Sequence, residues 1–417
     1  MMSLSSPRVV RDNRFVINES EVRLDTGPPG PSRAVRMWLL LAAALVLATV
    51  LVGGWTRLTD SGLSITEWKP VTGVIPPLDA DDWADEFRKY KETYQSKKLN
   101  FDMTLDEFKR IFGWEWWHRT MGRLVFLSVL LPFGVFAARG RLSGELKRKL
   151  WLVLGLIALQ GFIGWYMVSG SLDDDVKVMP YRLALHLGVA TTIFCALLSI
   201  GLGQDQRTRP QTTVHHWVGN SIRMIVALVF ALIIFGALVA GHRAGRTYDT
   251  WPLMAGQLIP AGLFNLSPWY VNFFQNDLTV QFIHRLLAYA LCLFVFVHWA
   301  RVQRYEADAR LQRGARLLAL AVLVQVALGI ITIWLTVPPV LGSLHQLTAF
   351  CVFTLGIWHL YEIERHPVKA LEDGSFVPAD VPVRANPLTL DMAARAQKAA
   401  TAVIDYGKRR LDERRNK

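Results

Sequence analysis

Residues 115–123 read EWWHRTMGR, and the apolar run LVFLSVLLPFGVFAA follows directly at residues 124–138. Such a run is typical of a helix that enters a lipid bilayer. An ionisable side chain inside a bilayer costs about 3 kcal/mol or more unless it is paired, solvated or bound to a ligand. Glu115, His118 and Arg119 therefore predict a functional site at one end of a membrane helix.

The composition of the whole chain is that of a protein that crosses the bilayer several times. Of its 417 residues, 52% are hydrophobic and only 19% are charged, which is unusual for a soluble protein. We predict an all-α membrane protein with eight transmembrane helices. Runs that approach the roughly 20 apolar residues needed to span a bilayer lie at about 36–54, 121–138, 150–168, 182–202, 222–241, 281–300, 315–335 and 343–361.

The formal net charge of +12 comes largely from short connections and tails, so it does not indicate nucleic-acid binding. Basic residues cluster in the connections 139–149, 203–221 and 301–314, and both tails are basic. Because Lys and Arg accumulate on the cytoplasmic side, we expect both termini in the cytoplasm and the long loops 55–117 and 242–280 outside. Acidic residues in the N-terminal tail argue against a mitochondrial transit peptide. A bacterial inner membrane is therefore the expected location.

The chain repeats itself. The paired segments are WWHRTMGRL and FIHRLLAYA around His118 and His284, LQGFIGW and VQVALGI around Gln160 and Gln325, and LALHLGVATTIF and GSLHQLTAFCVF around His186 and His345. The first helix of each half also ends alike, in LVGGWTR and LVAGHRA. An even number of helices gives both halves the same orientation, related by an axis along the membrane normal. We expect two tandem, pseudo-symmetric four-helix bundles.

This duplication predicts the domain organisation. The expected parts are a cytoplasmic N-terminal tail at 1–35, a first bundle at 36–202, a cytoplasmic linker at 203–221, a second bundle at 222–362 and a cytoplasmic C-terminal tail at 363–417.

Four histidines occupy repeat-related places: His118 and His186 in the first half, and His284 and His345 in the second. Their helices run inward, so we expect all four in the first one or two turns, near the outer surface. Two imidazoles on facing helices are the axial-ligand arrangement of a haem iron. Zinc is the competing metal, but it would need a third or fourth ligand nearby, and no Cys or His cluster supplies one.

Other polar residues near these histidines leave alternatives open. Arg119 and Arg285 follow His118 and His284 directly, and such arginines either anchor a helix at the membrane interface or pair with haem propionates.

His298 and His359 each lie 14 residues after a repeat histidine, which is about 21 Å further along a helix. That spacing also fits a stacked second haem. Pro132 and Ile200 stand at the corresponding places of the first half, so this feature is not part of the duplication.

The two halves differ beside the first histidine. Glu115 precedes His118 by three residues, whereas Gln281 precedes His284 by three. The spacing puts both on the face of their histidine, but only the carboxylate can take up a proton. The first half is therefore predicted to be catalytic and the second to hold a cofactor. In the alternative interpretation, Glu115 only pairs with Arg119.

The outer loop of the first half carries a helix-start signal. Thr104 and Glu107 form a predicted capping box, in TLDEFKRIF. A helix that begins there would lead into the segment of Glu115 and His118 and cover the site from outside.

From about Arg36 to Arg365 the chain resembles the haem A synthase family. The most specific segments are GGWTRLTDSGLSITEWKPVTGVIPPL, EFKRIFGWEWWHRTMGR, QGFIGWYMVSGSL, GHRAGRTYDTWPLM and NDLTVQFIHRLLAY. The resemblance implies oxidation of a ring methyl of haem O to the formyl group of haem A through hydroxylated intermediates.

The resemblance also implies roles for single residues. His118 and His186 would ligate the substrate haem, and Glu115 would assist the chemistry. His284 and His345 would hold a haem b that relays electrons. The long first outer loop resembles the proteobacterial and mitochondrial branch of the family.

The implied partners are the synthase that supplies haem O, cytochrome oxidase assembly factors, membrane lipid, an unidentified electron acceptor and further copies of the chain. Some members of the family carry a cysteine pair in an outer loop. The three cysteines here, Cys195, Cys292 and Cys351, all lie in apolar runs. The alternative function is a non-enzymatic dihaem b-type cytochrome that exchanges electrons with quinone, and the difference between Glu115 and Gln281 argues against it.

Overall fold

A computed structural model describes residues 32–169 and 178–369, so most of each predicted tail lies outside the described residues. In the described part of the chain, eight helices are long and apolar enough to cross a membrane, which confirms the predicted number. They are α1 (Arg33–Leu58), α4 (Leu105–Ala138), α5 (Gly144–Ser169), α6 (Pro180–Leu202), α7 (His216–His242), α10 (Asp277–Tyr305), α11 (Ala309–Trp334) and α12 (Pro339–Glu364).

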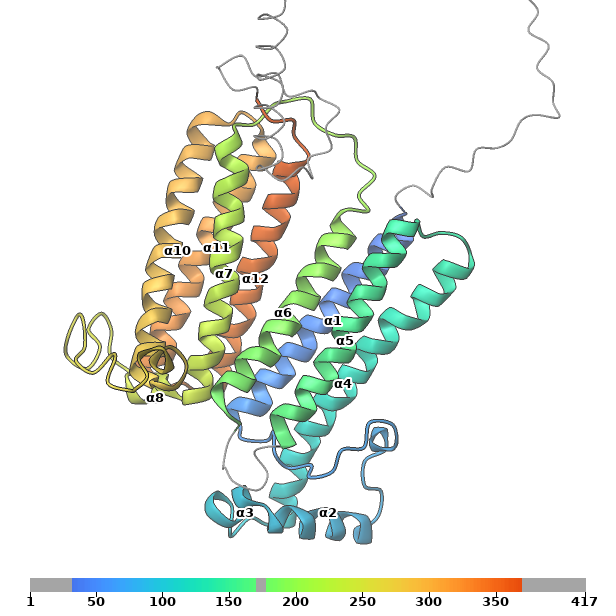
Figure 1. Cartoon of the computed structure of the whole chain (residues 1–417), viewed down its shortest axis with the longest axis vertical. Helices are drawn as coiled ribbons and strands as arrows, with labels where there is room; N and C mark the ends of the chain where they lie inside the picture. The colour runs from blue at the N-terminus through green and yellow to red at the C-terminus, as the bar shows by residue number, and fades with distance from the viewer. Residues whose placement is uncertain (1–31, 170–177, 370–417) are drawn as a thin grey trace, which may run out of the picture.

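The helices gather in two groups of four (Figure 1). In the first group, each of α1, α4, α5 and α6 contacts the next, and α6 contacts α1 again. In the second group, α7, α10, α11 and α12 contact one another in the same cyclic order. The helices that carry the repeat histidines, α4 with α6 and α10 with α12, are thus diagonal partners across their groups. The strict symmetry of the two halves stays a prediction.

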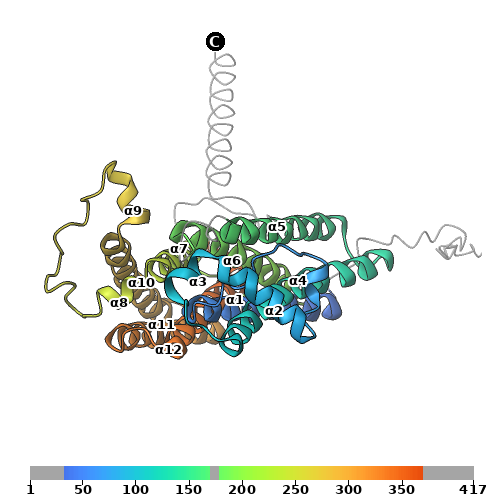
Figure 2. The same cartoon turned by 90° about the horizontal axis from the view of Figure 1, so that it is seen from below.

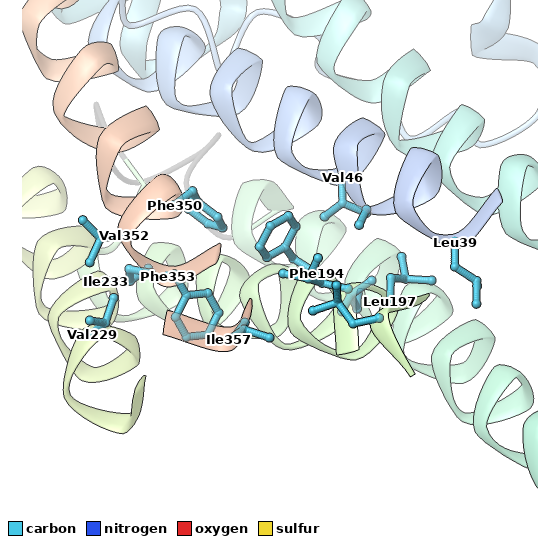
Figure 3. Close-up of a cluster of buried hydrophobic side chains, with 14 of the residues drawn as sticks. Leu39, Val46, Phe194, Leu197, Val229, Ile233, Phe350, Val352, Phe353 and Ile357 are labelled. Atoms are coloured by element: carbon cyan, nitrogen blue, oxygen red, sulfur yellow. The ribbon is translucent and has the colours of Figure 1, made fainter. Parts of the chain in front are cut away.

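Buried aromatic side chains fill the seam between the two groups. Phe194 of α6 packs edge-on against Phe350 of α12, with ring centroids 5.5 Å apart, and lies 6.5 Å from the ring of Phe353 (Figure 3). Phe194 and Phe353 are 159 residues apart, the same separation as His186 and His345. Equivalent positions of a repeat meet in this way where the halves are related by a twofold axis.

Ion pairs connect the two halves at both ends of this seam. In the linker, Asp205 accepts hydrogen bonds from Arg36 of α1 (3.0 Å) and from Arg365, which follows α12 (2.8 Å). At the opposite end, Asp60 pairs with Arg243, which follows α7. The seam therefore has an apolar interior, and the ion pairs at its two ends fix the relative position of the bundles.

Helix α4 begins well before its membrane-spanning part. The predicted capping box is present: the Thr104 hydroxyl accepts the Glu107 N–H, and the Glu107 carboxylate accepts the Thr104 N–H at 2.9 Å. The helix then continues without a break to Ala138. His118 therefore lies about three and a half turns inside α4, which corrects the expected place in its first one or two turns.

The two long connections lie over one end of the bundles. The first contains η2 (Thr72–Val74), α2 (Ala80–Glu92) and α3 (Tyr94–Leu99), and the second contains α8 (Ala244–Thr247), η3 (Trp269–Val271) and α9 (Asn272–Gln275). Helix α2 contacts α4. Figure 2 shows α2 and α3 across the ends of the first-group helices, with α8 and α9 on the side of the second group.

The arrangement of these connections leads to a topology prediction. The connection between α6 and α7 lies at the end opposite to α2, α3 and α8 (Figure 1). We expect reporter fusions or cysteine labelling to place residues 139–149, 203–221 and 301–314 in the cytoplasm, because these segments are basic. A tag within residues 203–221 that reacted from outside would contradict this orientation.

Candidate functional site

The two histidines of the first half face each other inside their bundle. The ring centroids of His118 on α4 and His186 on α6 are 6.5 Å apart, with the ring planes at 68°. Because a metal–imidazole bond is about 2 Å long, two imidazoles on one iron have ring centres roughly 6 Å apart. The observed spacing therefore fits a pair of axial ligands.

The histidines of the second half occupy the equivalent diagonal positions. His284 lies on α10 and His345 on α12. The Nδ1 atoms of both rings are buried and have no hydrogen-bond partner among the described residues. A buried polar atom without a partner is costly. This pair is therefore incomplete without a further group.

Each of the four rings lies against a glycine of a neighbouring helix. Gly53 of α1 faces His118, Gly164 of α5 faces His186, Gly236 of α7 faces His284 and Gly329 of α11 faces His345. A Cβ at Gly53 would lie 2.5 Å from Cε1 of its histidine, and one at Gly329 would lie 2.9 Å away. A larger residue would push the ring out of place. Three of these glycines, Gly53, Gly164 and Gly329, lie within the repeated segments of the sequence, but the repetition alone did not indicate their contact with the histidines.

A glutamine also contacts the second histidine of each half. The Gln160 amide nitrogen lies 3.1 Å from Nδ1 and 3.2 Å from Nε2 of His186. The Gln325 amide nitrogen lies 3.3 Å from Nε2 of His345. The sequence comparison aligned these glutamines, and the structure shows that they have equivalent partners.

Glu115 is turned toward the first outer loop. Its Oε2 accepts hydrogen bonds from Ser64 N (2.7 Å), Ser64 Oγ (2.7 Å) and Ile65 N (3.0 Å). Its Oε1 accepts from Arg119 Nε (3.1 Å) and Nη2 (2.7 Å). The residue is only 3% exposed. Both carboxylate oxygens are thus held by donors, and the ion pair with Arg119 is present together with an anchor for the loop.

The arginines beside the first histidines hold loop backbone in both halves. Arg119 donates to the carbonyl oxygens of Ile65 (3.0 Å) and Glu67 (3.2 Å). Arg285 donates to those of Tyr248 (3.1 Å) and Leu253 (3.3 Å). In each half, the arginine after the first histidine therefore holds the outer loop in place. Contact with haem propionates stays a prediction for both arginines.

The difference between Glu115 and Gln281 is reflected in their partners. The Gln281 amide nitrogen donates to the Tyr248 carbonyl at 2.9 Å, whereas Glu115 accepts from backbone N–H groups. The Gln281 Oε1 atom is buried and finds no partner in the part of the chain that the structure describes. The first outer loop thus presents N–H donors to Glu115, whereas the second outer loop presents a carbonyl acceptor to Gln281.

Over most of its length the chain is similar in sequence to proteins of one family. The sequence pattern of the cytochrome oxidase assembly protein family matches residues 36–357. The haem A synthase of Rhodopseudomonas palustris (strain BisA53) is 49% identical over 79% of this chain and 91% of its own length. This chain belongs to the haem A synthase family. The haem A synthase of Bradyrhizobium sp. (strain BTAi1 / ATCC BAA-1182) is 46% identical over 81% of this chain and 93% of its own length. That of Nitrosospira multiformis is 43% identical over 80% of this chain and 94% of its own length.

In this member of the haem A synthase family, a second histidine pair lies near the opposite end of the second bundle. The Nε2 atoms of His298 and His359 are 3.0 Å apart, and the residues are 1% and 0% exposed. Two metal–imidazole bonds of about 2 Å each would separate these atoms by roughly 4 Å. The pair is thus joined by a direct hydrogen bond, with Ser221 Oγ 2.6 Å from His298 Nδ1. This arrangement does not fit the stacked second haem considered above.

The cysteines of this haem A synthase family member lie in membrane helices. Cys195 is in α6, Cys292 in α10 and Cys351 in α12, and all three are free thiols.

Proposed function

We propose that this chain is a membrane-bound haem A synthase, an oxidoreductase that converts a ring methyl of haem O into the formyl group of haem A through hydroxylated intermediates. Membership of the haem A synthase family supports the reaction. The observation that carries the assignment within this chain is the 6.5 Å spacing of the His118 and His186 rings beside a buried carboxylate, Glu115. The second half has a histidine pair without that carboxylate.

The substrate haem O binds in the first half, with His118 and His186 as its iron ligands. Oxidation of a methyl group releases protons as well as electrons, and a general base speeds such a step. Glu115 lies one helical turn before His118 on the same face. The Ser64 hydroxyl can either donate or accept a hydrogen bond, so it can turn to accept from a protonated Glu115.

The second half suits a resident haem b held by His284 and His345. The unpartnered Nδ1 atoms of both rings are consistent with ligands that await a metal, and Gly236 and Gly329 let the two rings pack closely against the neighbouring helices. A bound haem b supplies one-electron transfer. Each guanidinium has five N–H groups. The bonds that Arg285 makes to loop carbonyls leave several of these free for a propionate, whereas Arg119 has fewer left.

The remaining features of the proposal concern organisation and partners. The first bundle, residues 36–202, is the substrate half, and the second, residues 222–362, is the cofactor half. The protein lies in a bacterial inner membrane with both termini in the cytoplasm. It receives haem O from the synthase that makes it and acts with cytochrome oxidase assembly factors. It passes electrons to an acceptor whose identity is open, and it assembles with copies of itself.

The proposal predicts the haem content of cells. In a bacterium that makes haem O but lacks its own haem A synthase, expression of this chain should lead to haem A, identified by chromatography and mass. His118→Ala should abolish haem A and leave haem O, because the substrate loses an iron ligand. His216→Ala, at an exposed position at the start of α7, is the matched control and should retain haem A formation. Absence of haem A with the unmodified chain, despite bound haem O, would contradict the proposal.

A further inference from the structure

A glutamine and a glycine one helical turn apart face the second histidine of each half. On α5, Gln160 and Gly164 both approach His186. On α11, Gln325 and Gly329 both approach His345. Residues four apart lie on the same side of a helix. Each ring therefore packs between a glutamine amide and the bare backbone of a glycine.

An iron-bound histidine has a chemical need that the amide can meet. A neutral imidazole has one N–H and one bare nitrogen. When the bare nitrogen binds a metal, the N–H at the other nitrogen needs an acceptor, and that acceptor sets the orientation and basicity of the ligand. In a membrane interior, water is not at hand to supply it.

The glutamine side chains have acceptor capacity left. In the described structure Gln160 Oε1 is buried without a hydrogen-bond partner, while the amide nitrogen lies next to the His186 ring. A half-turn of the Gln160 amide exchanges its oxygen and nitrogen and gives up the bond from that nitrogen to the His186 carbonyl oxygen, which is 3.0 Å long. The Gln325 Oε1 atom receives the Thr348 hydroxyl and, with two lone pairs, can accept a second hydrogen bond.

We propose that Gln160 and Gln325 are positioning residues that accept a hydrogen bond from the N–H of the iron-bound His186 and His345. This inference rests on the proposed function, because it requires that both histidines bind haem iron. Gly164 and Gly329 allow the rings to lie close enough to these helices to reach the amides. The repeated Gln-x-x-x-Gly spacing is thus a ligand-orienting device present once in each bundle.

The two copies of this device differ in the group that holds the amide. Thr348, three residues after His345, contacts the amide of Gln325. Val189 stands three residues after His186 and has no polar side-chain atom to do the same. The glutamine of the second half is therefore held by a side chain on the helix of its histidine. Gln160 is held by the backbone instead, because its amide nitrogen donates to the His186 carbonyl oxygen at 3.0 Å.

The test uses the purified full-length protein with its bound haem b. A hydrogen bond from the ligand N–H makes the imidazole a stronger donor and stabilises ferric iron. Gln325→Leu should therefore raise the midpoint potential of the haem. Gln325→Glu offers a stronger acceptor and should lower it. Thr348→Val should shift the potential in the same direction as the leucine variant but less.

Val324→Leu is the matched control, because Val324 precedes Gln325 on α11 with an exposed side chain. Its potential should equal that of the unmodified protein. If the leucine variant lost its haem, the glutamate and Thr348→Val variants would decide. Potentials in those variants that are unchanged, or that move in the same direction, would overturn the inference while haem binding still supported the proposed function. An unmodified protein without haem b would count against the proposed cofactor itself.

The first half is tested by substrate binding. Haem O added to purified Gln160→Leu protein should give a low-spin signal with altered electron paramagnetic resonance parameters compared with the unmodified chain. A variant spectrum identical to that of the unmodified protein would overturn the role of Gln160 and leave that of Gln325 to its own test.

Discussion

His284→Ala and His345→Ala should each remove most of the b-type absorption of the purified protein. Each histidine is one of only two proposed protein ligands to the iron of haem b, and alanine has no atom that can replace a metal–nitrogen bond. The ring also fills the space against Gly236 or Gly329, so its loss opens a cavity beside the cofactor. The measurement is the reduced-minus-oxidised difference spectrum, normalised to protein.

The natural control for this experiment is the other histidine pair of the same bundle. His298→Ala and His359→Ala remove a buried hydrogen-bonded pair, so they should lower stability but leave the b-type spectrum of the folded protein. We therefore compare spectra of protein that elutes as a single species. The assignment of haem b to His284 and His345 would fail if the His298 and His359 variants lost a comparable haem while the His284 and His345 variants kept it.

Glu115→Gln should lower haem A formation by roughly 100-fold or more, the effect expected for loss of a general acid or base. Haem O, together with a hydroxylated intermediate, should accumulate in the cells. The spectrum of the haem b held by His284 and His345 should be unchanged, because Glu115 belongs to the other bundle. Extraction and chromatography of the haems give both quantities from one culture. Near-normal haem A production would show that Glu115 serves only as a partner of Arg119 and the loop.

Because Glu115 also contacts the outer loop, a second variant, Ser64→Ala, is needed for comparison with Glu115→Gln. Gln281 is accommodated in the second half because its amide nitrogen donates to a backbone carbonyl. At position 115 the partners are the N–H groups of Ser64 and Ile65, so a glutamine there also weakens the anchor of the outer loop. Ser64→Ala removes one donor to the carboxylate but keeps the proton acceptor. A loss of activity in Ser64→Ala as large as in Glu115→Gln would show that the hydrogen bonds of the carboxylate matter as much as its ability to take up a proton.

Two features of the fold could be predicted because they depend on local sequence. The eight spans follow from the length of apolar runs, since a spanning segment that pairs its backbone groups within itself must form a helix. The early start of α4 follows from the capping box of Thr104 and Glu107, which is a contact within one turn. The register of the first helix of each half was harder to predict. Matching their ends pairs Gly53 with Ala240, whereas the residue that faces His284 is Gly236, one turn earlier.

The sequence by itself therefore determined the membrane-spanning helices, the duplication and the four histidines, because ionisable groups in apolar helices and repeated segments can be seen without a structure. The tertiary structure decided the partners of those groups. Glu115 binds Ser64 and Ile65, about 50 residues away, and His298 binds His359 directly. Helical periodicity predicts the face on which a side chain lies. The group that it meets there depends on how distant helices and loops pack, which no local pattern contains.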